Sequence, residues 1–306
     1  MSTTTAIPQA TLREVTPGIE QPEDAIADAL CQRRTDATKL EGDLPFLTNE
    51  MTIRRGLNRD LEPGEEIKAG RGDFGTISFS AKKQAGRFDL YYEKQVDASY
   101  FEVDLVAHWV GEARKDANTA TDLKFADVLR STTLNLEWDA DTDGNGEWDD
   151  LANGTPQQDM VDISDQVPHA NMAIIGRGVA SALRKQIAFH GQDFYFDSGG
   201  VVTLNSVRRQ VGDIFTIDPE RVHVLDERTF NQAALGEDYD LGFIGNDVFW
   251  VGTDYDLQMV DPDHEKNRYA EQDHVAGIGD IITYIRFVDI CRNVVENGLT
   301  VSNALT

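Results

Sequence analysis

The sequence predicts an α+β fold, because strand patterns and helix patterns are both present along the chain. A short apolar strand from Met172 to Ile175 leads through a Gly turn into a helix with one apolar face. A second apolar run, Val222 to Leu225, has the composition of a buried strand, and Phe243 to Trp250 contains a third strand pattern. Between Asp122 and Glu137, apolar residues recur at helical spacing.

The composition limits the function classes. The chain has 306 residues and a net charge of −26. Nucleic-acid binding through phosphate contacts needs clustered Lys and Arg, so we expect any DNA nearby to be held by enclosure. No apolar run is long enough to cross a bilayer and the start lacks a signal-peptide pattern, which predicts no membrane partner and a cytoplasmic site of synthesis. Cys31 and Cys291 fit no metal or redox spacing, so we expect two reduced thiols.

The N-terminal region predicts an arm followed by a short helix. Residues 1–20 contain Pro, Gly and several Thr without an apolar period, so we expect them to become ordered only by contact with other chains. Pro22 and the acids after it favour a helix start. The apolar stripe of this helix is expected to end near Ala37 and is too small to fold alone.

Residues 56–95 predict a long β-hairpin. Its strands are expected at Thr76 to Ser80 and Phe88 to Tyr92, joined by a polar turn at Lys82 to Gly86. An isolated hairpin is marginally stable and its apolar side chains lack partners within it, so we expect it to lie on another subunit. The near-neutral charge of this segment, on an otherwise acidic chain, also favours docking onto a neighbour.

The next region predicts a strand and a helix up to Asn118 and then a second helix from Asp122 to Glu137, which Thr121 can cap. Residues 140–250 are expected to form a mixed sheet with helices. Two closing strands are predicted, at Val275 to Val288 and Val294 to Leu305.

Three segments together resemble a known family: Pro168 to Arg184, Val222 to Asn231 and Phe243 to Trp250. Their order is similar to the C-terminal half of tailed-phage (Caudoviricetes) major capsid proteins, where a strand and helix precede two further strands. Upstream, Tyr100 to Glu137 resembles the segment that contains the family's spine helix, and Cys291 to Ala304 resembles its closing strand and tail. The resemblance covers residues 60–306 and implies the HK-97-like capsid fold.

This resemblance implies an N-terminal arm, an extended hairpin loop, a peripheral domain with the spine helix, and an axial domain. We expect these parts at residues 1–55, 56–97, 98–140 with 255–306, and 141–254, respectively. The implied function is a major capsid protein that self-assembles into hexamers and pentamers of an icosahedral phage head around double-stranded DNA.

The implied partners are further copies of the chain, a portal protein and a decoration protein. Because the hairpin begins near residue 56, a separate scaffolding protein is expected as well. The resemblance places the protein in the virion, after assembly in the host cytoplasm. Two alternatives stay open: an encapsulin-type compartment of the same fold, which encloses an enzyme, and a calcium-binding surface module, which would need loop repeats that the chain lacks.

We do not expect an enzyme. Asp197 to Gly200 resembles the nucleophile segment of trypsin-like proteases, but no His lies in the sequence context that this chemistry needs. No motif supplies a nucleophile, a base and an oxyanion donor together.

Residues 139–150 match the opening of a twelve-residue calcium loop. Carboxylates at alternate positions can converge on one cation, and Gly144 permits the turn. The last position is an Asp rather than the usual bidentate Glu, and no clear helix follows. The candidate ligands are Asp139, Asp141, Asp143, Asn145, Glu147 and Asp150. The alternative is an acidic surface loop, and no cofactor is expected to be required.

Overall fold

The structure is a computed structural model that describes residues 4–7, 25–34, 37–47, 74–91, 105–186, 203–225, 229–231, 241–243, 245–262, 269–275, 279–292 and 297–305. Its helices are α2 (Ile26–Leu30), α5 (Leu105–Arg130), α6 (Pro156–Gln166), α7 (Arg177–Lys185), α9 (Leu204–Phe215), η1 (Pro219–Arg221) and η3 (Asp254–Asp256). Its strands are β1 (Thr4–Ile7), β2 (Gln32–Arg34), β3 (Glu41–Leu47), β4 (Phe74–Ser80), β5 (Lys82–Tyr91), β6 (Leu136–Asp139), β7 (Met172–Gly176), β8 (Val222–Leu225), β9 (Thr229–Asn231), β10 (Leu241–Phe243), β11 (Phe249–Gly252), β12 (Leu257–Val260), β13 (Tyr269–Val275), β14 (Gly279–Arg292) and β15 (Gly298–Ser302).

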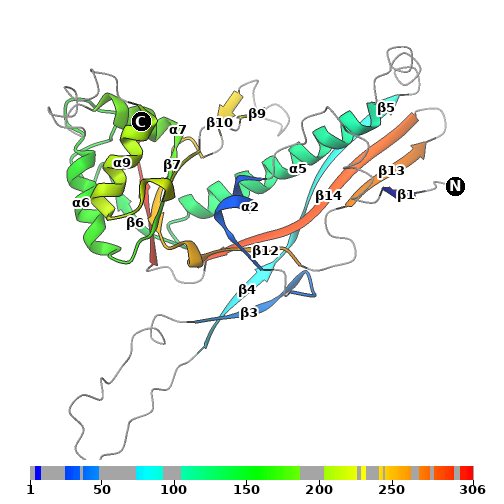
Figure 1. Ribbon diagram of the computed structural model, residues 1–306, viewed down its shortest axis with the longest axis horizontal. Coiled ribbons are helices and arrows are strands. Elements are labelled where there is room, and N and C mark those ends of the chain that lie inside the picture. Colours follow the sequence, from blue (N-terminus) through cyan, green and yellow to red (C-terminus); the bar gives the residue numbers. More distant parts are fainter. Residues whose placement is uncertain are drawn as a thin grey trace, which may run out of the picture.

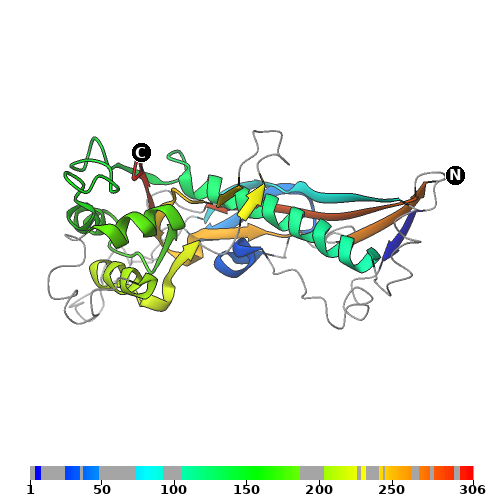
Figure 2. The ribbon, with the colours of Figure 1, turned by 90° about the horizontal axis from the view of Figure 1, so that it is seen from above.

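The molecule is elongated, with a rounded body at one end and a long shaft at the other (Figure 1). The shaft consists of a six-stranded sheet and helix α5. Its sheet has the order β1-β13-β14-β12-β2, and β5 pairs with the other edge of β14. Helix α5 runs along one face of the sheet (Figure 2). Trp109 of α5 stacks on Phe88 of β5 with ring centroids 4.9 Å apart, and Leu90 and Ile282 join the same buried cluster.

The body consists of a five-stranded sheet and helices α6, α7 and α9. Its sheet has the order β6-β15-β11-β7-β8. One face packs on the three helices around Trp148 and Phe249, whose rings meet edge to face with centroids 4.9 Å apart. The other face packs on the end of α5 through Phe125 and Trp250. All residues of β7 are buried and α7 follows it directly, so the predicted strand and helix at this place are confirmed.

The predicted hairpin between residues 76 and 92 is wrong in its pairing. Strand β4 pairs with β3, from Glu41↔Ser80 to Leu47↔Phe74, while β5 pairs with β14. The polar run at Lys82 to Gly86 is therefore strand and not turn. The lysines lie on an exposed edge strand, where charged residues are common. Gly86 contacts helix α5, so neither the lysines nor the glycine indicates a turn here.

The predicted boundaries of the long helix are also wrong, because one helix runs from Leu105 to Arg130. Thr121 lies inside it, and its Oγ1 donates to the carbonyl of Ala117 at 2.9 Å, so it caps nothing. The helix stops before Glu137 because Asn135 Nδ2 donates to the carbonyls of Val128 and Ser131, both at 2.9 Å.

Both ends of the chain differ from expectation. Helix α2 ends at Leu30 rather than near Ala37, and the chain continues as β2, which pairs in parallel with β12. The closing strand β15 pairs with β11 and β6 in the body. Residues 136–139 and 298–302 therefore share a sheet with β7. No helix among the described residues is long and apolar enough to span a membrane.

Candidate assembly surfaces

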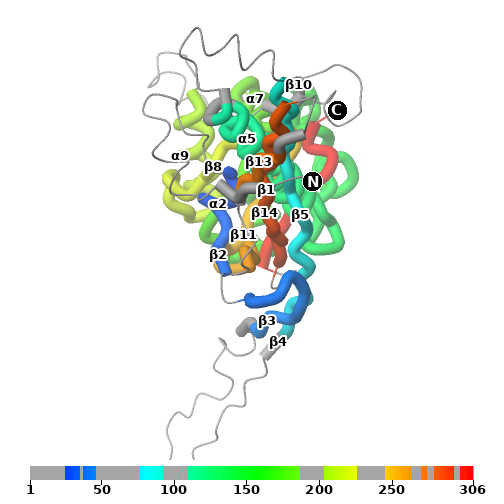
Figure 3. The backbone as a smooth tube through the Cα atoms, turned by 90° about the vertical axis from the view of Figure 1, so that its right-hand side faces the viewer, coloured from blue at the N-terminus to red at the C-terminus, as the bar shows by residue number. Residues whose placement is uncertain are grey.

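The ribbon formed by β3 and β4 projects from the side of the shaft (Figures 1 and 3). At its base, Leu44 and Phe79 pack on Val260 and Cys291 of the shaft. The amide of Ser80 donates to a carboxylate oxygen of Asp289 at 2.7 Å. The base is therefore fixed to its own chain. The expectation that the apolar side chains of residues 56–95 need another subunit is wrong for Phe79 and Leu90, which are buried within this chain.

Sequence reasoning placed β3 in the N-terminal arm and so missed half of this ribbon. Gly42 and Pro45 lower the strand propensity of Glu41–Leu47, and Pro is tolerated only at sheet edges or bulges. The alternation of Leu44 and Phe46 with other residues is the signal that could have identified the strand.

A second surface is the face of the shaft sheet that points away from α5. Side chains alternate along a strand, and directly paired residues share a face. On β5 this face carries Lys83, Arg87, Asp89 and Tyr91, which are all exposed. On β14 their neighbours include half-buried Ile281, Thr283 and Phe287. None of the described helices covers this mixed apolar and charged face.

The predicted calcium loop forms a compact turn in which the acids bind the loop itself. Asp139 accepts hydrogen bonds from the amide of Asp141, at 3.1 Å, and from Asn303 Nδ2, at 3.0 Å. Its own amide donates to Asp143 at 3.1 Å. The Asn303 bond, ahead of the others, lowers the pKa of Asp139. These bonds engage the carboxylates of Asp139 and Asp143 with groups of the protein itself.

The remaining candidate ligands lie further along the same loop. Asn145 donates to Thr155 Oγ1 at 3.0 Å, and Asp150 accepts from the amide of Ala152 at 2.8 Å, which lowers the Asp150 pKa. Within the described ranges, no group of three or more His, Cys, Asp or Glu is placed to hold a metal. Calcium binding by this loop stays a prediction.

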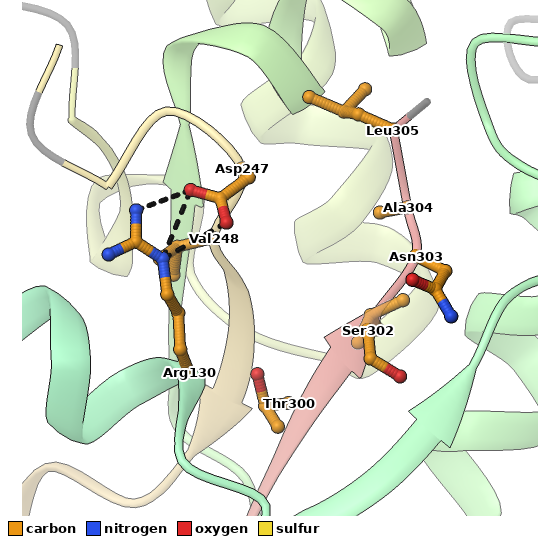
Figure 4. A pocket seen from close by; sticks show the side chains of 9 residues that line it. Arg130, Asp247, Val248, Thr300, Ser302, Asn303, Ala304 and Leu305 are labelled. Atoms are coloured by element: carbon orange, nitrogen blue, oxygen red, sulfur yellow. Dashed lines mark hydrogen bonds and ion pairs between the residues drawn. The ribbon is translucent and has the colours of Figure 1, made fainter. Parts of the chain in front are cut away.

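A small pocket of about 230 Å³ lies where the end of α5 meets the C-terminal residues (Figure 4). Arg130 Nε donates to both carboxylate oxygens of Asp247, at 3.1 and 3.0 Å. Thr300, Ser302 and Asn303 line the other side. The Arg–Asp pair neutralises itself, so the pocket offers hydroxyl and amide groups but no activated nucleophile.

A buried polar network joins shaft and body. Trp250 Nε1 donates to Asn135 Oδ1 at 2.8 Å, and the Arg292 guanidinium lies over the Trp250 ring, 5.1 Å from its centroid. Burial lowers the pKa of Arg292 to about 10, and nearby Asp256 partly offsets this shift. The network ties α5, β11 and β14 at one point, so shaft and body meet at a specific, rigid joint.

Asp197 to Gly200, the segment that resembles a protease nucleophile, lies outside the described residues. Asp261, directly after β12, is buried and forms an ion pair with Arg33. That pairing explains why this acid follows strand β12.

The comparisons with known proteins concern the fold. No family model matches the chain, and no curated protein matches it. A phage-related protein from Bordetella bronchiseptica RB50 is similar with a TM-score of 0.65 at 13% identity, over 96% of each chain. The capsid of cyanophage P-SCSP1u has a TM-score of 0.54 at 11% identity, over 91% of this chain and 88% of that one. A virus-like particle from Pyrococcus furiosus has a TM-score of 0.52 at 12% identity, over 96% of this chain and 99% of that one.

Proposed function

We propose that this chain, which has the HK-97-like fold of tailed-phage capsid proteins, is the major capsid protein of a tailed phage. In this proposal, copies of the chain form hexamers and pentamers of an icosahedral head that encloses double-stranded DNA. The shaft corresponds to the peripheral domain and the body to the axial domain. The role is structural, with no catalytic step and no required cofactor, and the protein resides in the virion after assembly in the host cytoplasm.

The projecting ribbon of β3 and β4 carries this proposal. Leu47 and Phe74 are directly paired at its outer end, and residues 48–73 link these two strands along the sequence. A two-stranded ribbon is marginally stable in water without a further packing surface. A neighbouring copy is the natural partner for its outer half, and such contacts, weak singly, add up in a closed shell.

Charge supports the same arrangement. Copies that each carry −26 repel one another, so a stable contact needs a locally less acidic surface. Strand β5 supplies one, since it exposes Lys82, Lys83 and Arg87. The same net charge supports DNA held by enclosure rather than by attraction. The further partners in this proposal are a separate scaffolding protein, a portal protein and a decoration protein.

The test is to replace residues 48–73 with a short Gly–Ser turn between Leu47 and Phe74. We expect a folded chain with unchanged tryptophan fluorescence that stays unassembled in sedimentation velocity. A second variant replaces residues 48–73 with a Gly–Ser segment of the original length. It distinguishes the loss of side-chain contacts from the loss of segment length, and it should also stay unassembled. Shells at unchanged yield from the shortened variant would contradict a role in assembly for the segment that joins β3 to β4.

The similarity to the Pyrococcus furiosus virus-like particle favours a second candidate, a protein compartment of the same fold. Both candidates predict closed shells, and they differ in content. Purified particles from the native source should protect DNA from nuclease if the chain is a phage capsid protein. Particles that contain a folded enzyme and no protected DNA would identify a compartment instead.

A further inference from the structure

Residues Ala25–Arg34, here called the strap, lie across the shaft as a short helix and a short strand. Helix α2 has five residues, and its N-cap residue, Ala25, has no side chain that could accept a hydrogen bond. Strand β2 has three residues. An isolated helix shorter than about 12 residues is marginal in water, so the strap depends on the elements that it touches.

The strap binds the shaft through a buried ion pair. Asp28 accepts two hydrogen bonds from Arg286 on β14, at 2.9 and 2.5 Å, and Arg286 is 1% exposed. Among the described residues, Asp28 is the carboxylate that pairs with this guanidinium. A buried cation that loses its partner is strongly unfavourable, so this pair favours the closed strap.

Further contacts tie the strap to α5 and to β12, and Arg33 of the strap forms an ion pair with Asp261, directly after β12. The amide of Ala27 donates to Asp122 Oδ1 at 3.0 Å, and Asp122 lies well inside α5. Strand β2 pairs in parallel with β12, and Arg34 Nη1 donates to Gln258 at 3.3 Å. The strap thus joins three elements that are far apart in the sequence.

The apolar contribution of the strap is small by comparison. Its fully buried side chains are those of Ala25, Ala27 and Cys31, while Ile26 and Leu30 are only partly buried. Short side chains bury little apolar area, so the polar contacts contribute most to the attachment of the strap to the shaft. Removing the strap would leave most of the buried cluster around Phe125 and Trp250 in place.

We propose that the strap is a conformational switch, which opens and closes as a unit while the rest of the chain stays folded. In the closed state the N-terminal segment is tied to the interior of α5 and of β14, so a displacement of that segment acts on the long helix of the shaft. The switch is a property of the single chain and does not depend on the proposed function.

The two cysteines provide separate reporters of this opening. Cys31 belongs to the strap, and burial raises the pKa of its thiol. Cys291 packs with Leu44 and Phe79 at the base of the ribbon, and burial raises its thiol pKa to about 12. Such thiols react with an alkylating reagent only when they become exposed. Strap opening should therefore expose Cys31 and leave Cys291 protected.

The experiment alkylates the full chain with iodoacetamide across urea concentrations below unfolding and measures each cysteine by mass spectrometry. Cys31 should react faster than Cys291 and with a weaker dependence on urea, because local opening exposes little surface. Equal rates with the same urea dependence at both cysteines would overturn the proposal. This comparison uses the unmutated protein, so it does not depend on any variant folding.

Variants then test the ion pair. Asp28→Asn should raise the rate at Cys31 about tenfold or more and change Cys291 little. Asp127→Asn, an exposed acid on α5, is the control and should change neither rate. Combining Asp28→Asn with Arg286→Met should return Cys31 towards the original rate, because an apolar side chain beside Met259 replaces the unpaired charge. An unchanged Cys31 rate in Asp28→Asn would contradict the switch.

Discussion

Trp148 and Asp159 show how single residues fix the acidic loop to the body. Trp148 is fully buried, and its Nε1 donates to Asp159 Oδ2 at 2.7 Å. Thr155 Oγ1 donates to the other carboxylate oxygen at 3.2 Å. Burial raises the pKa of Asp159 and outweighs these two bonds, which lower it. The carboxylate therefore anchors Trp148 at a cost while it is ionised.

Asp159→Asn should make the stability difference from the unmutated chain depend on pH. A raised pKa in the folded state means that Asp159 favours folding below its unfolded pKa and loses this contribution as pH rises through its folded pKa. Asn can still accept from Trp148 without this loss, so the variant should gain about 1 kcal/mol relative to the original chain between pH 4 and pH 7.

Urea unfolding followed by tryptophan fluorescence at the two pH values measures this change. Asp165→Asn, an exposed acid on the same helix, is the control and should show the same difference at both pH values. A pH-independent difference for Asp159→Asn would contradict the assigned cost of burial.

Calcium binding by the 139–150 loop is a separate prediction. We expect modest affinity, because the last candidate ligand is an Asp and the acids already bind the loop. Calcium should protect the loop from limited proteolysis, and Asp141→Ala with Asp143→Ala should remove this protection without unfolding the chain. Equal cleavage of the original chain in calcium and in chelator would leave an acidic surface loop.

Among the elements, the contact of α5 with β5 sets the geometry of the shaft. A Cβ added at Gly86 would lie 2.2 Å from the carbonyl oxygen of Ala113 and 2.8 Å from its Cα. The helix backbone thus rests directly on the strand backbone at this point. Any side chain at residue 86 has to push the helix away from the sheet.

Gly86→Ala should lower the free energy of unfolding by about 1–3 kcal/mol, as overpacking in a tight contact does. Gly111→Ala is the matched control, since Gly111 lies in α5 with nothing within 4 Å of the added Cβ. It should raise stability by about 0.5–1 kcal/mol, because Ala favours a helix over Gly. Urea denaturation measures both, and equal effects of the two substitutions would refute the direct backbone contact.

Sequence patterns predicted an element correctly where a single property, such as burial on both faces, determines its residues. They failed where contacts between distant parts of the chain determine the local structure. Met172–Gly176 is apolar throughout because it is buried on both faces. Gly86 and Lys82 suggested a turn. Instead, Gly86 lies against the backbone of α5 at Ala113, and Lys82 lies on an exposed edge strand. Thr121 suggested a cap because Thr is common at helix N-termini, but Thr also occurs inside helices, where its hydroxyl donates to the carbonyl one turn earlier, here that of Ala117.

The calcium loop illustrates the same limit for a site. The spacing of Asp139, Asp141 and Asp143 is visible in the sequence, but the Asp139 carboxylate accepts a hydrogen bond from Asn303, more than a hundred residues later. The ribbon strand β3 was likewise hidden, because its partner β4 lies beyond residues 48–73. Local pattern gives candidate residues, and long-range contacts decide where they point.

At the scale of the whole molecule, charge should govern assembly. Each chain carries −26, so screening by salt weakens repulsion between copies more than it weakens the few attractive pairs. We expect the fraction of protein in intact particles to rise between low and molar sodium chloride, as measured by sedimentation. Particles that dissociate as salt is raised would show that attractive ion pairs dominate the interfaces.

The central claim is that this fold builds a closed shell, and negative-stain microscopy of the purified full chain, expressed with its proposed scaffolding partner, tests it most directly. The account predicts closed particles of uniform size with hexameric and pentameric units, and DNA-filled interiors when the particles come from infected cells. Monomers or irregular aggregates under all these conditions, from a chain that is folded by circular dichroism, would contradict it.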